Sequence, residues 1–146
     1  MTPLGSVRFA SAVTLLAIGF GLGAVYPSSV AQAQPGSRVF ELRTYTAPEG
    51  KLPDLNKRFR DHTLRIFQKH GMTNIGYWVP QDAPANDNTL IYIISHANRE
   101  AAKKSWADFA ADPEWKKVSA ESQVNGRIVA KVDSVFMDAT DYSPIK

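Results

Sequence analysis

The fold of this 146-residue chain is constrained most by the order in which strand-like and helix-like segments follow one another. Residues Arg38–Tyr45 alternate between polar and apolar side chains and are rich in β-forming residues, which predicts a strand. Further strands are predicted at Thr73–Pro80, Thr89–Ala97 and Ile128–Met137. The segment Thr89–Ala97 is the most apolar of the four, so we expect it to lie in the middle of the sheet.

Helical segments separate these strands. The first is predicted from about Lys51 or Pro53 to Lys69, with Gly71 as its C-terminal stop. Its apolar face is expected to contain Leu52, Leu55, Phe59, His62 and Ile66. Asn98 is a suitable N-cap for a helix that ends near Ala111, and Asp112 followed by Pro113 predicts that a helix restarts there.

The resulting order, β-α-β-β-α-β, predicts an α+β domain with the ferredoxin-like split βαβ arrangement. Both helical regions would then cover one face of an antiparallel sheet. The strands carry too many apolar residues for all of them to face the helices, as Ile75, Ile91 and Ile93 illustrate. An uncovered apolar face indicates a partner, so we expect a homodimer in which two sheets pack face to face as a dimeric α/β barrel.

The first 33 residues differ from the rest of the chain. Arg8 is the only charged residue before Arg38, and an apolar run from Phe9 to Tyr26 is followed by Ala31-Gln32-Ala33. These three parts predict a secretory signal peptide that is cleaved after Ala33. Residues 34–37 would form a short linker and residues 38–146 the domain. The protein would be periplasmic or secreted, and would contact a membrane only if the segment were retained as an anchor.

Composition excludes several classes of function. The chain has no cysteine, which excludes disulfides, thiol catalysis and Fe–S clusters. The predicted mature chain has 16 basic and 14 acidic residues without a basic stripe, so we expect no nucleic-acid partner. His62 and His70 would lie about 12 Å apart along one helix, too far to share a metal ion. We therefore predict no metal site, and no motif indicates a cofactor.

Five residues are candidates for ligand binding. His62 is predicted to face the sheet, where a neutral imidazole can accept a proton, although a core histidine is the alternative. Arg43 and Tyr45 share one strand face and can bind a carboxylate, unless Arg43 simply pairs with Glu41. Trp78 and Tyr92 belong to an aromatic set that suits a small, flat, apolar or aromatic ligand, or an ordinary core.

Several short motifs, taken together and in order, resemble the NIPSNAP family. They include Glu41-Leu42-Arg43-Thr44-Tyr45, Arg58-Phe59-Arg60-Asp61-His62-Thr63, Gly76-Tyr77-Trp78 and Trp106-x-x-Phe109-x-x-Asp112-Pro113-Glu114-Trp115-Lys116. The resemblance covers about residues 39–144 and implies a ferredoxin-like fold that pairs as a dimeric α/β barrel. It implies no particular reaction, because no catalytic motif defines the family.

Two classes of function remain open from the sequence. One is a small-molecule site, binding or catalytic, between the sheet and the helices and lined by the five candidate residues. The other is a non-catalytic structural or protein-interaction module in which the same residues only pack. The polar cluster on an otherwise apolar strand face favours the first class, and the lack of a catalytic motif favours the second.

Overall fold

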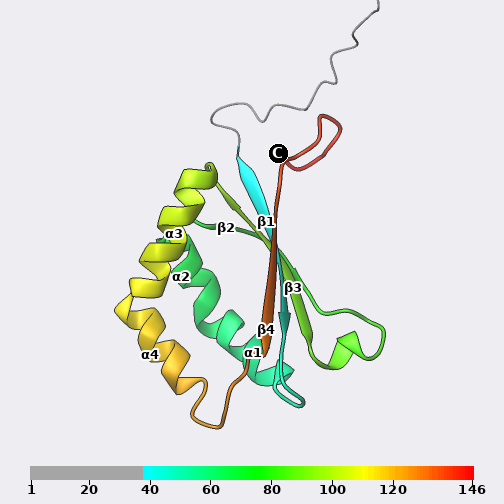
Figure 1. Ribbon diagram of the computed structural model, residues 1–146, viewed down its shortest axis with the longest axis vertical. Coiled ribbons are helices and arrows are strands. Elements are labelled where there is room, and N and C mark those ends of the chain that lie inside the picture. Colours follow the sequence, from blue (N-terminus) through cyan, green and yellow to red (C-terminus); the bar gives the residue numbers. More distant parts are fainter. Residues whose placement is uncertain (1–37) are drawn as a thin grey trace, which may run out of the picture. The chain divides into compact units, whose positions relative to one another are not determined.

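The computed structural model describes residues 38–146, which form one α+β unit (Figure 1). The predicted signal peptide and linker lie outside the described residues. The strands are β1 (Val39–Thr46), β2 (Thr73–Trp78), β3 (Thr89–His96) and β4 (Lys131–Met137). Among residues 38–146, no helix has the length and apolar character needed to cross a bilayer.

The helical segments begin and end near the predicted positions. They are α1 (Leu52–Arg58), a π-helical turn η1 (Phe59–Thr63), α2 (Leu64–Lys69), a 3₁₀ turn η2 (Ala85–Asp87), α3 (Arg99–Ala111) and α4 (Pro113–Glu121). The Asn98 side chain accepts a hydrogen bond from the Ala101 amide at 2.8 Å and so caps α3. Asp112 caps α4 in the same way, with Pro113 in the first turn.

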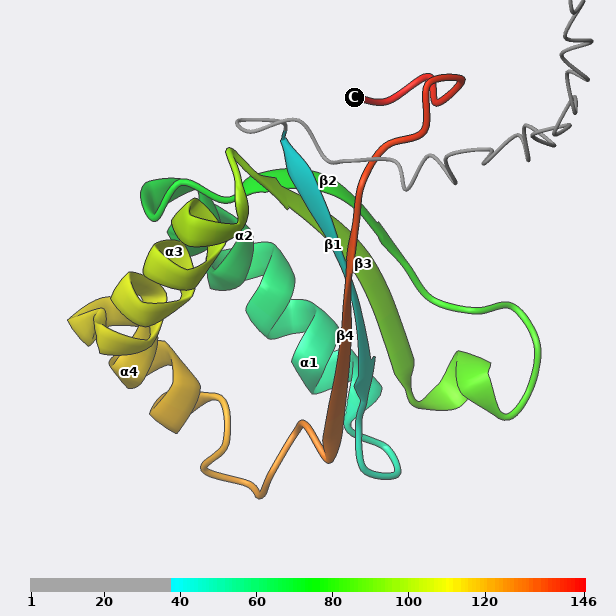
Figure 2. The ribbon, with the colours of Figure 1, turned by 45° about the horizontal axis from the view of Figure 1, so that its top comes forward.

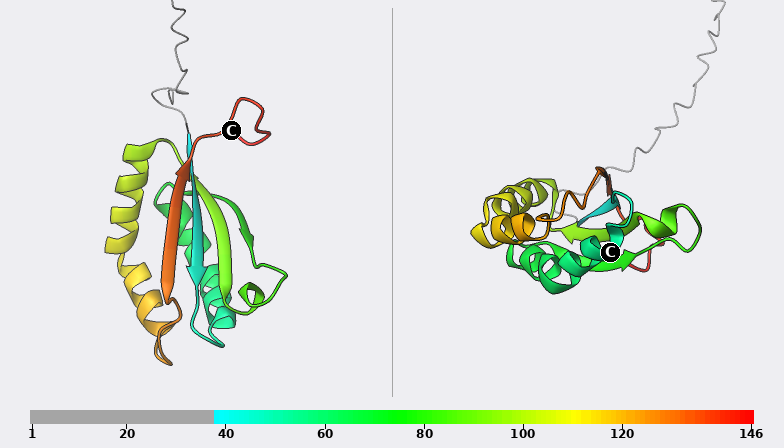
Figure 3. Two further views of the ribbon diagram at one scale, coloured as in Figure 1. Left: turned by 45° about the vertical axis from the view of Figure 1, so that its right-hand side comes forward. Right: turned by 90° about the horizontal axis from the view of Figure 1, so that it is seen from below.

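The four strands form one antiparallel sheet in the order β2-β3-β1-β4. The two central strands are therefore β1 and β3, and β2 and β4 are the edges (Figure 3). The four α-helices lie on one side of the sheet, as Figure 2 shows. This is the ferredoxin-like arrangement predicted from the order of the segments.

The core lies between the helices and the sheet and is dominated by aromatic rings. Tyr92, in the central strand β3, is fully buried. Four rings surround it at centroid distances of 5.2 to 6.0 Å, and they belong to Tyr45, Phe59, Phe67 and Tyr77. Offset and edge-to-face contacts of this kind add to the stability gained by burying the rings. The core thus fixes β3 against the long helical segment.

The π turn changes which residues of that segment face the sheet. A π turn contains one more residue than an α turn, so the inward positions shift around the helix axis. Thr63 is buried, and its hydroxyl donates a hydrogen bond to the Arg58 carbonyl at 3.2 Å. His62 is exposed instead. The prediction that His62 faces the sheet is therefore wrong, because it assumed an uninterrupted α-helical period.

The other face of the sheet carries no helix and is largely apolar (Figure 2). By strand register it presents Phe40, Leu42, Trp78, Ile91, Ile93, Val135 and Met137. Val135 is 55 % exposed and Trp78 is 51 % exposed. The C-terminal segment after β4 lies at one end of this face, where it forms a shallow hollow with Phe40 and Ile93. The remainder is open to solvent.

Candidate functional site

Three of the five candidate residues come together on the helix-facing side of the sheet. The alternation of β1 places Glu41, Arg43 and Tyr45 on that side. Antiparallel pairing sets Arg43 directly opposite Tyr92 of β3. The rings of Tyr45 and Tyr92 meet with their centroids 5.3 Å apart. The strand pattern predicted that Arg43 and Tyr45 share one strand face, and the pairing of β1 with β3 brings Tyr92 beside them.

Glu41 is the centre of a buried polar cluster beside these residues. One carboxylate oxygen accepts hydrogen bonds from Trp106 Nε1 at 2.7 Å and from His96 Nε2 at 3.1 Å. The other accepts from Arg43 at 2.7 Å and from the Ser134 hydroxyl at 2.6 Å. Burial alone would raise the pKa of Glu41, but the four donors outweigh it and lower this pKa from 4.5 to about 2. Glu41 is therefore ionised throughout the neutral range.

Arg43 uses only part of its hydrogen-bonding capacity in this cluster. One terminal nitrogen pairs with Glu41, and the guanidinium lies over the Trp106 ring, 4.2 Å from its centroid. The Nε atom is buried and has no partner among the described residues. On the neighbouring edge strand β4, Val132 and Ser134 point to the same side of the sheet but are exposed. The helix layer thus leaves this edge of the site open.

Arg58 is a second buried arginine, and its place in the interior was not predicted from the sequence. Only 6 % of the residue is exposed, and no carboxylate in residues 38–146 pairs with it. Its guanidinium stacks 5.1 Å from the Trp115 ring centroid and makes one long contact of 3.4 Å to Ser122 Oγ. Burial lowers the pKa of Arg58, and the nearby hydroxyls of Tyr45 and Tyr92 partly offset this effect.

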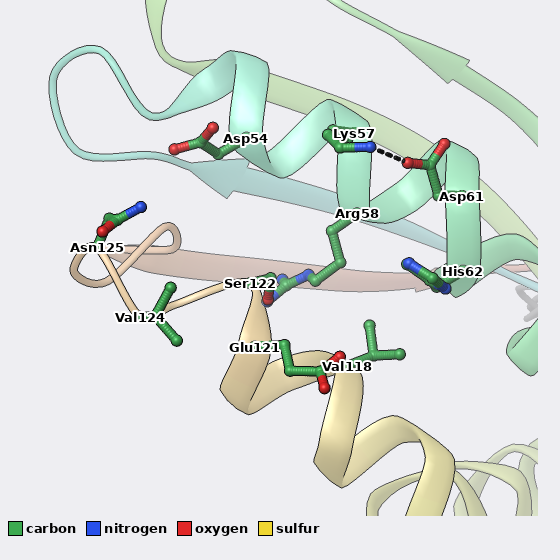
Figure 4. Close-up of a pocket in the computed structure, with 10 residues that line it drawn as sticks. All are labelled: Asp54, Lys57, Arg58, Asp61, His62, Val118, Glu121, Ser122, Val124 and Asn125. Carbon is green, nitrogen blue, oxygen red and sulfur yellow. Dashed lines mark hydrogen bonds and ion pairs between the residues drawn. The ribbon is translucent and has the colours of Figure 1, made fainter.

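A surface pocket between α1 and α4 leads to Arg58. Its volume is about 290 Å³ (Figure 4). It is lined by Asp54, Lys57, Arg58, Asp61, His62, Val118, Glu121, Ser122, Val124 and Asn125. In Figure 4 the Arg58 side chain extends from α1 across the pocket toward Ser122 on the other wall. We call this hollow the α1–α4 pocket.

The two remaining candidates lie elsewhere. His62 lines the rim of the α1–α4 pocket on the outer surface of the helix layer. Trp78 pairs with Ile91 on the open face of the sheet, opposite Tyr77 and Tyr92. The prediction that both line the space between sheet and helices is therefore wrong. Alternation alone could not tell which of Tyr77 and Trp78 faces the helices, because both are large aromatic residues.

The other two histidines have structural partners. His96 is fully buried at the end of β3 and packs beside Trp106. His70, just after α2, lies 2.6 Å from the Asp112 carboxylate. Within residues 38–146, no three His, Asp or Glu side chains are grouped as metal ligands would be.

The fold and its interior define the class to which this chain belongs. A four-stranded antiparallel sheet covered on one face by helices defines a ferredoxin-like α+β domain. Residues 40–144 match the NIPSNAP family, and the chain belongs to that family. Among curated protein sequences, none matches the chain.

Solved structures of similar proteins agree with this fold. A NIPSNAP family protein of unknown function from Agrobacterium tumefaciens has a TM-score of 0.65 at 21 % identity, covering 76 % of this chain and 96 % of that chain. A NIPSNAP-like domain protein from Burkholderia xenovorans gives 0.64 at 16 % identity, covering 75 % and 91 %. SnoaB, a cofactor-independent oxygenase from Streptomyces nogalater, gives 0.50 at 13 % identity, covering 74 % and 98 %. At these identities the similarity establishes the fold alone.

Proposed function

We propose that this domain binds a small organic molecule between its helix layer and its sheet. One observation carries the proposal: the Nε atoms of Arg43 and Arg58 and the hydroxyl of Tyr92 are all buried without a hydrogen-bond partner among the described residues. Unpaired buried polar groups are rare because each costs free energy. Arg43 lies 5.5 Å from the Tyr45 ring centroid and directly opposite Tyr92 in the neighbouring strand.

A ligand with both flat apolar and polar parts fits this environment. Tyr45 and Trp115 are half-buried rings, each beside one of the two arginines, and the two guanidinium groups offer donors. Such a mixture, with a few polar groups among aromatic walls, is typical of small-molecule sites.

The alternative is an interaction module, and the open face of the sheet supports it. We propose that two copies of the chain pack through this face, because exposed residues such as Trp78 and Val135 form an apolar surface. We also propose that the protein acts outside the cytoplasm, on the basis of its first 33 residues. Both proposals are compatible with a small-molecule site on the opposite, helix-covered face.

A pair of tyrosine variants tests the small-molecule site. The Tyr77 hydroxyl donates to Asn74 at 2.6 Å, whereas the neighbouring Tyr92 hydroxyl has no partner. Tyr77→Phe should therefore lower the free energy of unfolding by about 1 kcal/mol, and Tyr92→Phe should leave it unchanged or raise it. A thermal-shift screen of aromatic acids, haem and lipid-like compounds would then identify ligands.

The expected result is a compound that stabilises the wild-type and Tyr77→Phe proteins but stabilises Tyr92→Phe less. Tyr142→Phe serves as a second control, because that residue is 84 % exposed. If no compound stabilises the wild-type protein and Tyr92→Phe unfolds as readily as Tyr77→Phe, the residues only pack and the interaction-module alternative is favoured.

A further inference from the structure

The charges around the α1–α4 pocket are balanced except at one residue. Three carboxylates line the pocket, and each has a lysine as ion-pair partner. The pairs are Asp54 with Lys51, Asp61 with Lys57, and Glu121 with Lys117. The guanidinium of Arg58 is the one charge on the pocket wall that has no opposite charge within ion-pair distance among residues 38–146.

An unpaired guanidinium is costly where it lies. Arg58 is 6 % exposed, and a buried charge without a partner is unfavourable relative to one in water. Its single contact to Ser122 is long, at 3.4 Å, and joins it to a neutral hydroxyl. Figure 4 shows this side chain crossing the pocket between its two walls, so a ligand that enters the pocket reaches it. One negative charge would complete the balance.

We infer that Arg58 anchors the carboxylate group of a small organic acid in the α1–α4 pocket. This inference goes beyond the proposed function, because no strand residue within 38–146 lines the α1–α4 pocket. A guanidinium fork matches a carboxylate, with two parallel charge-assisted hydrogen bonds. Val118 and Val124 provide apolar contact for the rest of the ligand (Figure 4). A single negative charge is favoured over a phosphate dianion, because the three carboxylates are already paired with lysines and one charge is enough to balance Arg58.

The experiment compares acids with their neutral amides. Acetate, hexanoate, benzoate and 2-naphthoate, and the four corresponding amides, are titrated into purified protein and followed by calorimetry and NMR. At least one acid should bind, with its amide at least about tenfold weaker. The Nε–H resonance of Arg58 should shift as that acid is added. This comparison needs no variant, so it remains decisive if substitution at Arg58 impairs folding.

Two matched variants then test whether binding of the acid depends on Arg58. Arg58→Met should weaken binding of the acid about tenfold or more, to the level of the amide. Arg60→Met should leave binding unchanged, because Arg60 lies on the same helical segment but is exposed and outside the pocket. Inorganic phosphate should compete weakly. Tighter binding of phosphate than of any carboxylate would assign an inorganic-anion site and overturn the inference.

Other outcomes separate this inference from the proposed function. If acids and amides bind equally and Arg58→Met changes neither, the carboxylate anchor is wrong. The small-molecule site would still stand in that case if binding depends on Tyr92. If no acid or amide of the panel binds at about 10 mM and the Arg58 resonance does not move, the inference fails. The thermal-shift screen with the tyrosine variants then tests the proposed site between sheet and helices independently.

Discussion

The indole nitrogen of Trp106 donates a hydrogen bond of 2.7 Å to the carboxylate of Glu41, although the two residues are 65 positions apart in the sequence. This bond joins α3 to the central strand β1. His96, Arg43 and Ser134 donate to the same carboxylate, so Glu41 links β1, β3, β4 and α3. A buried carboxylate with four donors helps to specify how these elements meet.

The stability of the fold should therefore depend on the charge of Glu41. Its pKa is about 2 in the folded protein against an ordinary value of 4.5, so ionised Glu41 favours folding above pH 4.5. This stabilisation, on the order of 3 kcal/mol, is lost as the pH falls from about 4.5 to about 2. Glu41→Gln should lower the free energy of unfolding at pH 7, and denaturant titrations of the two proteins should converge toward pH 2. A constant difference between them at all pH values would contradict this assignment.

Arg58→Met should behave differently from substitutions elsewhere in the core. Methionine keeps much of the contact with Trp115 but removes a buried charge that has no carboxylate partner among the described residues. We expect the free energy of unfolding to stay within about 1 kcal/mol of the wild-type value or to rise. Chemical denaturation of Arg58→Met beside Arg60→Met measures this. A loss above about 2 kcal/mol would instead identify Arg58 as a structural residue.

The open face of the sheet should be the dimer interface. Light scattering of the wild-type protein should give about twice the monomer mass. Val135→Glu places a charge on the open face and should yield monomers. Val132→Glu is the matched control, because Val132 lies on the same strand, points to the opposite face and is 41 % exposed. Equal masses for both variants would exclude this face as the interface.

The protein should be exported and should begin near Gln34. The basic residue, apolar run and Ala31-Gln32-Ala33 site support cleavage after Ala33. Sequencing the N-terminus of protein recovered from the extracytoplasmic fraction tests this directly. Recovery from the cytosol with Met1 retained would contradict export, and recovery from membranes with Met1 retained would indicate an anchor.

The features that the sequence predicted correctly depend on local patterns. The caps at Asn98 and Asp112, the stop at Gly71 and the order of strands and helices all follow from side chains and their near neighbours. The pairing of Arg43 with Glu41 was an open alternative, and it follows from two-residue alternation along one strand. These local rules were sufficient to establish the fold class.

The features that the sequence did not predict depend on tertiary packing. The buried state of His96 arises because Trp106 and Phe136 pack beside it, and neither is close to it in sequence. The burial of Arg58 was not predicted, because arginine is rarely buried and Arg58 falls outside the predicted apolar face. The sequence offered one signal of the π turn, which is a threonine five residues after Arg58. The Thr63 hydroxyl can donate a hydrogen bond to the Arg58 carbonyl, which a widened turn leaves without its usual backbone partner.

The π turn makes the inward position of Arg58 depend on the presence of one additional residue in the helical segment. Deleting one residue between Phe59 and Thr63 would convert the turn to an α turn and rotate the preceding segment by about 100° relative to α2. Arg58 would then leave its inward position, while nothing outside this helix would change in sequence. Relatives that lack one residue at this point would be expected to lack the inward-facing arginine and with it the proposed carboxylate-binding group, and a difference in chain length would reveal this more readily than a substitution.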